Sequence, residues 1–113
     1  MILALDKHCA LHVFVSTEDA ERHLEAIDVQ QDALEFCDTT GQRYAPTFTR
    51  SPQEWRFGPL GIVDVGMFKL VAEGGSDVAL PDRFVERAAH IEHTSVPAIT
   101  SIEALRDELH KRA

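Results

Sequence analysis

The spacing of apolar residues predicts a strand followed by a helix in the first third of the chain. Residues 11–15, with the sequence LHVFV, are largely apolar and partly β-branched, which is typical of a buried strand. Ser16 then has the position of a helix N-cap, with Asp19 as the reaching acid of a capping box. Apolar residues recur at helical spacing after it, at Ala20, Leu24 and Ile27. One amphipathic helix is therefore expected from Ser16 to Asp28.

A β-hairpin is expected next. Residues 33–37 alternate between apolar and other side chains, which indicates a half-buried strand. The sequence DTTG follows, in which Asp38 can begin a turn and Gly41 can adopt a positive φ. Residues 42–44 would then begin the return strand.

The middle of the chain combines turn-forming residues with one strongly apolar run. Proline and glycine interrupt residues 46–61, so this stretch is expected to be mostly irregular, with a short turn of helix at residues 51–55. Residues 62–72 predict one or two strands, with a break or bulge at Gly66. The sequence EGGSD, residues 73–77, is expected to be a turn.

The C-terminal third has helical periodicity. Pro81 fits the first position of a helix whose apolar stripe extends to Ile91, and Thr100 with Glu103 forms the capping box of a last helix. The order of strand, helix, strands and two helices predicts one small α+β domain over residues 1–113. We expect a mostly antiparallel sheet with the helices packed on one face.

Composition and charge narrow the class of function. The 113 residues are 44% hydrophobic and carry a formal net charge of −8, which argues against binding to nucleic acid or to an anionic membrane. The N-terminal apolar run is too short for a secretion signal, and no window is long enough to span a membrane. Cys9 and Cys37 are expected to be free thiols in a reducing cytoplasm.

The acids are concentrated in one stretch. Residues 16–38 hold eight of the nineteen acids and a single Lys or Arg, Arg22. Such a run is often only a solvated surface, but it also suits a basic protein partner, which an acidic surface steers into contact. The candidate partner-binding residues are Glu21, Glu25, Asp28, Asp32 and Glu35, with Trp55 as an apolar anchor. A Trp in a loop is equally common as a cover over a small core.

Residues 13–44, with the sequence VFVSTEDAERHLEAIDVQQDALEFCDTTGQRY, resemble the N-terminal half of small bacterial immunity proteins encoded beside polymorphic toxins. The likeness covers roughly the first 45 residues and rests on a structural motif. It implies a non-enzymatic protein that binds one cognate toxin directly and blocks its active site or substrate groove. A basic toxin would match the acidic stretch.

No motif for catalysis, metal binding or a cofactor is present. His8 with His12, and His90 with His93 near an expected helix end, are pairs without a third ligand, so no metal and no cofactor is expected. Cys37 lies on a predicted strand among acids that would raise its pKa, which favours a packing role over a nucleophile. Two alternatives to the immunity function stay open. One is a small enzyme or metal-binding protein that uses Cys37 or the histidines, and the other is a structural subunit or homodimer that pairs through residues 62–71.

Overall fold

Six strands form one sheet in the order β7-β4-β3-β1-β2-β8, and two more form a separate ribbon, β5-β6. The computed structural model describes residues 1–50, 53–57, 60–64 and 66–111. The strands of the sheet are β1 (Ile2–Leu5), β2 (Ala10–Phe14), β3 (Glu35–Asp38), β4 (Gln42–Arg50), β7 (Met67–Ser76) and β8 (His90–Thr94). The helices are α1 (Thr17–His23), α2 (Ala26–Gln31), α3 (Leu80–Arg87) and α4 (Ile102–Lys111). All neighbouring strands of the sheet are antiparallel except β2 and β8, which are parallel.

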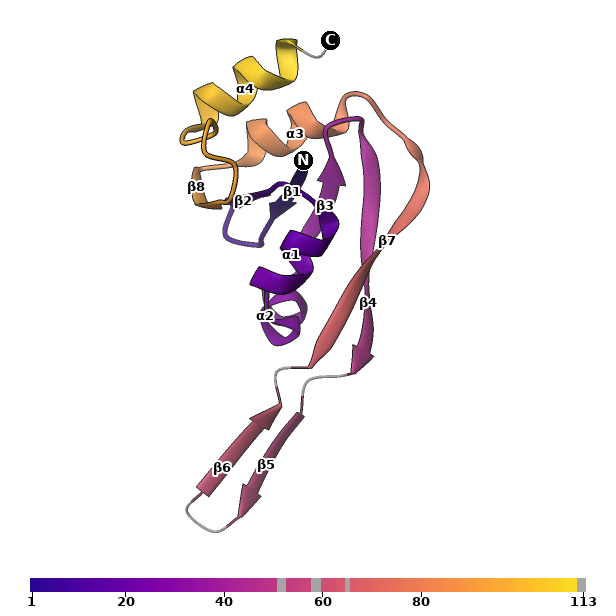
Figure 1. Cartoon of the computed structure of the whole chain (residues 1–113), viewed down its shortest axis with the longest axis vertical. Helices are drawn as coiled ribbons and strands as arrows, with labels where there is room; N and C mark the ends of the chain where they lie inside the picture. Colours follow the sequence, from indigo (N-terminus) through magenta and orange to yellow (C-terminus); the bar gives the residue numbers. More distant parts are fainter. Residues whose placement is uncertain (51–52, 58–59, 65, 112–113) are drawn as a thin grey trace.

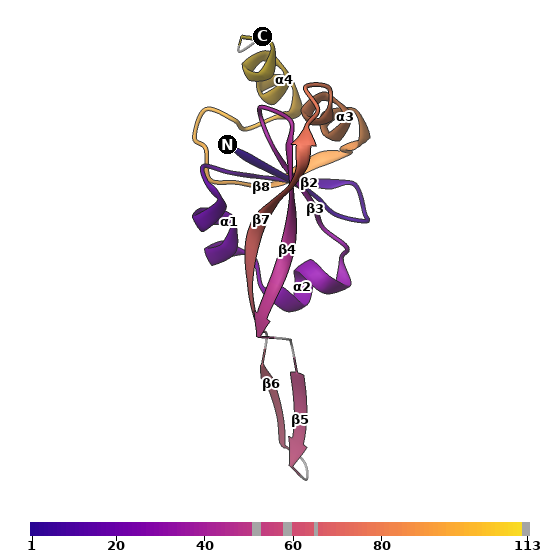
Figure 2. The ribbon, with the colours of Figure 1, turned by 90° about the vertical axis from the view of Figure 1, so that its right-hand side faces the viewer.

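The sheet has a hydrophobic core on each face. Ile2 and Ala4 of the central strand β1 belong to the core that α1 and α2 cover, whereas Leu3 and Leu5 belong to the core that α3 and α4 cover. Figure 2 shows the two helix pairs well apart. The predicted α+β class with a mostly antiparallel sheet is confirmed, but the helices lie on both faces and not on one. All four β1 residues are buried, so both sides of this strand need a cover.

The predicted helix over residues 16–28 is broken into α1 and α2. Its start is confirmed, because the Ser16 hydroxyl accepts the Asp19 N–H at 3.1 Å. Leu24 and Glu25 then have extended backbones, each with ψ of 137°. This break re-orients the chain so that Ala26 and Val29 of α2 are buried in the same core as Ala20. Packing therefore outweighs the helical periodicity at this point.

The predicted hairpin at the sequence DTTG is confirmed. β3 and β4 pair antiparallel, and Gly41 between them has a φ of +91°. The Asp38 carboxylate accepts the N–H groups of Thr40 at 2.9 Å and Gln42 at 3.0 Å, and the Tyr44 hydroxyl at 3.2 Å. These hydrogen bonds to Asp38 stabilise the conformation of the turn.

Most of the described residues in the middle of the chain lie in strands, which corrects the expectation of an irregular segment for these residues. β4 continues to Arg50, and β5 (Gln53–Phe57) pairs with β6 (Leu60–Asp64) in the ribbon that we call the arm. The predicted helix at residues 51–55 is wrong for 53–55, and positions 51 and 52 lie outside the described residues. The predicted break at Gly66 is confirmed by its φ of +79°. The predicted turn at EGGSD is wrong, since β7 extends to Ser76.

The arm projects away from the sheet and lengthens the molecule (Figure 1). The principal extents are 56 × 28 × 21 Å. The radius of gyration is 15.3 Å, against about 13 Å for a globular domain of this length.

The C-terminal third differs from its prediction in two places. α3 begins with Leu80 and Pro81 as expected, but it ends at Arg87, and the chain then forms the edge strand β8. In α4 the helix start is capped by Ser101, whose hydroxyl accepts the Ala104 N–H at 3.1 Å, and not by Thr100. Leu105 and Leu109 of α4 are buried in the core.

Candidate functional site

A cavity of about 380 Å³ opens where α2, the β1–β2 turn and the start of β8 meet. Its lining includes four carboxylates and three imidazoles, from Asp6, Asp28, Asp32, Glu92, His8, His12 and His90. The remaining lining residues are Ala10, Leu24 and Leu34, so none of the described residues around it is Lys or Arg. We call this site the acidic cavity.

The β1–β2 turn is organised around the carboxylate of Asp6. This group accepts the N–H of His8 at 2.8 Å and the N–H of Ala10 at 3.0 Å, and it lies 3.4 Å from Nε2 of His12. Cys9 between them has a φ of +63°. Burial by itself would raise the pKa of Asp6, but these hydrogen bonds outweigh it and lower the pKa below its ordinary value. Asp6 therefore carries a negative charge at neutral pH and lines one side of the cavity.

Asp28 and Asp32 face the cavity from α2 and its C-terminal end. In the described part of the chain, neither carboxylate has an ion-pair or hydrogen-bond partner. The nearby Lys7 is engaged elsewhere, since its ammonium group donates to the Gln31 carbonyl at 2.9 Å. On the opposite side, Glu92 lies 2.7 Å from Nε2 of His90. The cavity thus holds two carboxylates with imidazole partners and two without.

This arrangement can receive a cationic group. A Lys or Arg side chain from another protein would bring the positive charge that Asp28 and Asp32 lack. A metal ion would need three or four ligands directed at one point. Among the described residues, no group of three or more His, Cys, Asp and Glu side chains is arranged in this way.

The structure separates the six residues that the sequence proposed for partner binding. Asp28 and Asp32 lie in the acidic cavity, and the exposed Glu25 precedes α2. Glu21 turns toward β7, where it accepts the Leu70 N–H at 2.7 Å. The other two residues lie elsewhere: Glu35 pairs with Arg87 of α3 at 2.8 Å, and Trp55 lies on the arm opposite Ile62.

Sequence reasoning missed the cavity residues outside α2. His8 and His12 come from the β1–β2 turn and β2, and His90 and Glu92 from β8. These segments meet because β8 pairs parallel with β2, with Ala10 opposite His90. The histidines were visible in the sequence as two separate pairs, but His90 and His93 lie on a strand and not near a helix end. No local signal predicts that long-range pairing.

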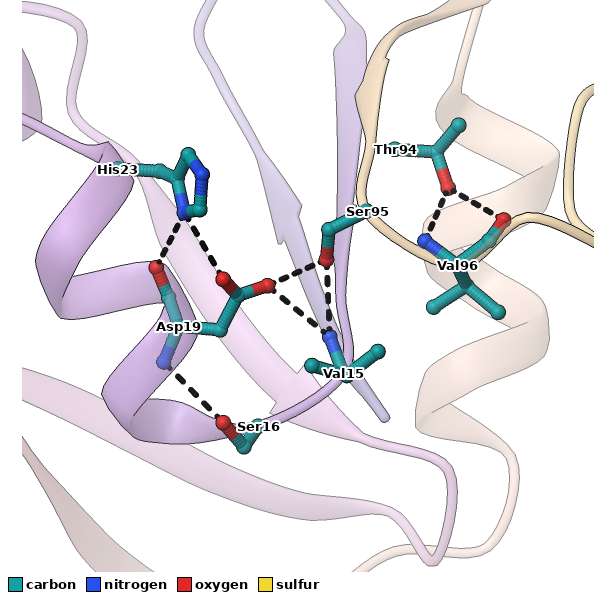
Figure 3. A network of polar contacts seen from close by, with 7 residues as sticks. All are labelled: Val15, Ser16, Asp19, His23, Thr94, Ser95 and Val96. Carbon is teal, nitrogen blue, oxygen red and sulfur yellow. Dashed lines mark hydrogen bonds and ion pairs between the residues drawn. The ribbon is translucent and has the colours of Figure 1, made fainter.

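A second polar cluster joins α1 to the end of β8 (Figure 3). Asp19 is 8% exposed, and its carboxylate accepts the Ser95 hydroxyl and, at 3.4 Å, the Val15 N–H. Nδ1 of His23 lies 2.9 Å from its other oxygen. The hydrogen bond from Ser95 is the main reason that the pKa of Asp19 is lowered. The His23 ring lies 5.5 Å from that of His93.

The order of groups in this cluster does not activate a nucleophile. In a Ser-His-Asp triad the imidazole lies between the hydroxyl and the carboxylate and takes the hydroxyl proton. Here the carboxylate of Asp19 lies in the middle, so the Ser95 hydroxyl donates to an acid and not to His23. The cluster instead connects β8 to α1 by hydrogen bonds.

Cys37 is a core residue. Its side chain is fully buried beneath α3 and α4, and burial, together with the charge of Asp38, raises its pKa to about 12. The predicted direction of this shift is confirmed, although burial contributes more than the neighbouring acids. A thiol with this pKa is a poor nucleophile at neutral pH.

The described helices are too short and too polar to cross a membrane. The chain matches no family model, no curated protein and no solved structure.

Proposed function

We propose that this chain is a non-enzymatic binding protein that neutralises a basic toxin in the cytoplasm by direct contact. The observation that carries the proposal is the acidic cavity, in which Asp28 and Asp32 have no partner among the described residues. Carboxylates without a cationic partner are available to a charge supplied by another protein.

The wider charge distribution supports a basic partner. The chain carries a formal net charge of −8, which would attract a cationic protein and raise the rate of encounter. Glu25 extends the negative surface beyond α2 on the exposed side. Glu21 and Glu35 already have partners within the chain, so they contribute to the long-range field more than to direct contact.

We infer that the partner is a toxin from the resemblance of residues 13–44 to immunity proteins. That resemblance includes α1, α2 and the β3–β4 turn, and the cavity takes Asp28 and Asp32 from this same segment. On this view, an Arg or Lys of the toxin enters the cavity while the surrounding surface covers the toxin's active site or substrate groove.

The test replaces the two unpaired carboxylates with neutral groups of the same shape. Tagged wild-type protein and Asp28→Asn/Asp32→Asn are used to capture partners from the source bacterium in low and in moderate salt, with identification by mass spectrometry. We expect wild type to capture one stoichiometric basic protein, and the variant to bind it at least about 10-fold more weakly. Purified partner then gives the affinity directly.

A matched control separates local charge from net charge. Glu86→Gln/Asp107→Asn also removes two acids, at exposed positions on α3 and α4 away from the cavity. This control should retain most of the affinity. Equal losses in both double variants, or no loss in either, would contradict the role of the acidic cavity. A captured partner without toxin activity would contradict the toxin role alone.

A further inference from the structure

The arm is a two-stranded ribbon that joins neither edge of the six-stranded sheet. A two-stranded ribbon gains stability from a third strand or a packed helix. Within the described part of the chain, β5 pairs with β6 alone, so its other edge has no strand beside it. An open edge of this kind is a template for pairing with another strand.

The register gives the arm two unlike faces. Trp55 opposes Ile62, Phe57 opposes Leu60 and Gln53 opposes Asp64, so these positions share one face of the ribbon, with apolar residues near its tip and polar residues at its base. The next pairs in the register, Glu54 with Val63 and Arg56 with Gly61, belong to the other face.

The sequence of β5 is complementary to itself. If two β5 strands pair antiparallel with Trp55 opposite Trp55 of the second copy, Glu54 lies opposite Arg56 of that copy, and Arg56 opposite its Glu54. Opposite charges and aromatic pairs both stabilise neighbouring strands. The β6 edge lacks this property, because pairing centred on Ile62 would place Leu60 opposite Asp64.

The shape of the molecule favours the arm over other surfaces for self-association. Two chains that each carry −8 repel one another, but residues 53–57 and 60–64 contribute a net charge of only −1, from two acids and one Arg. The molecule is 56 Å long with the arm at one end, so pairing through the arm holds the two bodies apart (Figure 1). The screening length is about 8 Å at physiological salt. The outer edge of β7 is less available, because Glu21 occupies the Leu70 N–H.

We propose that the protein forms a symmetric homodimer through antiparallel pairing of β5 with β5 of a second copy. The result is a four-stranded sheet in which Glu54 of each copy is opposite Arg56 of the other copy, on either side of the two-fold axis. This inference is independent of the toxin partner, since it uses the arm and not the acidic cavity.

Charge reversal tests the pairing directly. Sedimentation equilibrium of wild type should give a mass that rises with concentration from the 12.6 kDa of one chain to twice that value. Arg56→Glu places two acids opposite each other across the axis, and Glu54→Arg places two arginines there. Each single variant should raise the dimer dissociation constant at least 10-fold, and the double variant Glu54→Arg/Arg56→Glu should restore dimers.

Mixing the two single variants is the sharpest test. Arg56→Glu offers only acids and Glu54→Arg only bases, so we expect the mixture to form heterodimers while each variant alone stays monomeric. Arg106→Glu, at an exposed position on α4, has the same change in net charge as Arg56→Glu and should dimerise like wild type. A wild-type protein that stays monomeric at high concentration would overturn the proposal. Single variants that dimerise as well as wild type, or a mixture without heterodimers, would overturn it as well.

Discussion

The carboxylate of Glu21 on α1 accepts the backbone N–H of Leu70 on β7 at 2.7 Å. The Glu21 side chain is only 12% exposed, and the Lys69 ammonium lies 3.5 Å from its other oxygen. β7 is an edge strand, and its outward N–H groups would otherwise be open to pairing with another chain. The Glu21 carboxylate thus occupies one N–H of this edge strand, although the acidic run that contains Glu21 is typical of a solvated surface.

Removal of the Glu21 carboxylate should destabilise the fold. Glu21→Ala leaves the Leu70 N–H without its acceptor, and we expect a loss of about 1–3 kcal/mol in the free energy of unfolding, measured in urea. Glu25→Ala is the matched control, because Glu25 is exposed and makes no capping hydrogen bond. It should change stability by less than about 0.5 kcal/mol. Equal effects of the two substitutions would contradict the role of Glu21.

Three glycines should respond differently to alanine. At Gly41 a Cβ would lie 1.9 Å from the Asp77 carbonyl oxygen, and the φ of +91° is unfavourable for any L side chain. Gly74 has a φ of +69° but open space around it, and Gly75 has open space without a positive φ. Gly41→Ala should therefore cost more than about 2 kcal/mol, Gly74→Ala about 1 kcal/mol and Gly75→Ala close to nothing. Thermal unfolding of the three variants gives this ranking, and a mild effect at Gly41 would contradict the close approach of Asp77.

Asp19 should make stability sensitive to acid. Its pKa is lowered in the folded protein, so its stabilising contribution is present above the ordinary value of 3.8 and is lost as the pH falls through the folded pKa. Asp19→Asn should lower the free energy of unfolding by about 1–3 kcal/mol at pH 7. Its difference from wild type should narrow as the pH falls below about 4.

Ser95→Ala supplies an intermediate case for the same experiment. It removes the hydroxyl that contributes most to the lowered pKa of Asp19, while the N–H of Val15 and the ring of His23 remain. The acid dependence of this variant should lie between those of wild type and Asp19→Asn. If the free energies of unfolding of wild type and Asp19→Asn differ by the same amount at every pH, Asp19 is not the group responsible for the acid dependence.

The two thiols should differ in reactivity. Cys37 is fully buried with a pKa raised to about 12, whereas Cys9 is partly exposed. Iodoacetamide at pH 8 should therefore modify Cys9 in the folded protein and Cys37 only after unfolding, as peptide mapping would show. Because the pKa of Cys37 is raised from 9.0, its contribution to stability is present below pH 9 and is lost as the pH rises toward 12. Cys37→Ala should lose this part of the alkaline slope, and rapid labelling of Cys37 in native protein would contradict its burial.

Local sequence chemistry determined the features that depend on a few neighbouring residues. The Ser16 cap, the turn at Asp38 and Gly41, the break at Gly66 and the start of α3 at Pro81 all follow from side-chain or backbone preferences within one turn of the chain. The α+β class follows from the periods of the apolar residues, which reflect the geometry of helices and strands themselves. Asp28 and Asp32 were found because they lie close together on one short segment.

Long-range contacts decided the rest. The four residues of β1 are all apolar, so no alternation of apolar and polar side chains identifies them as a strand. Their place at the centre of the sheet depends on pairing with residues 10–14 and 35–38. The end of the first helix at His23, the strand at His90 and the acidic cavity likewise depend on segments far apart in the chain. The arm shows the same limit of local prediction, because the prolines and glycines among residues 46–61 favour an irregular loop, whereas β5 and β6 pair as strands. Such pairings gain their free energy from burial and hydrogen bonds between distant residues, which no local period encodes.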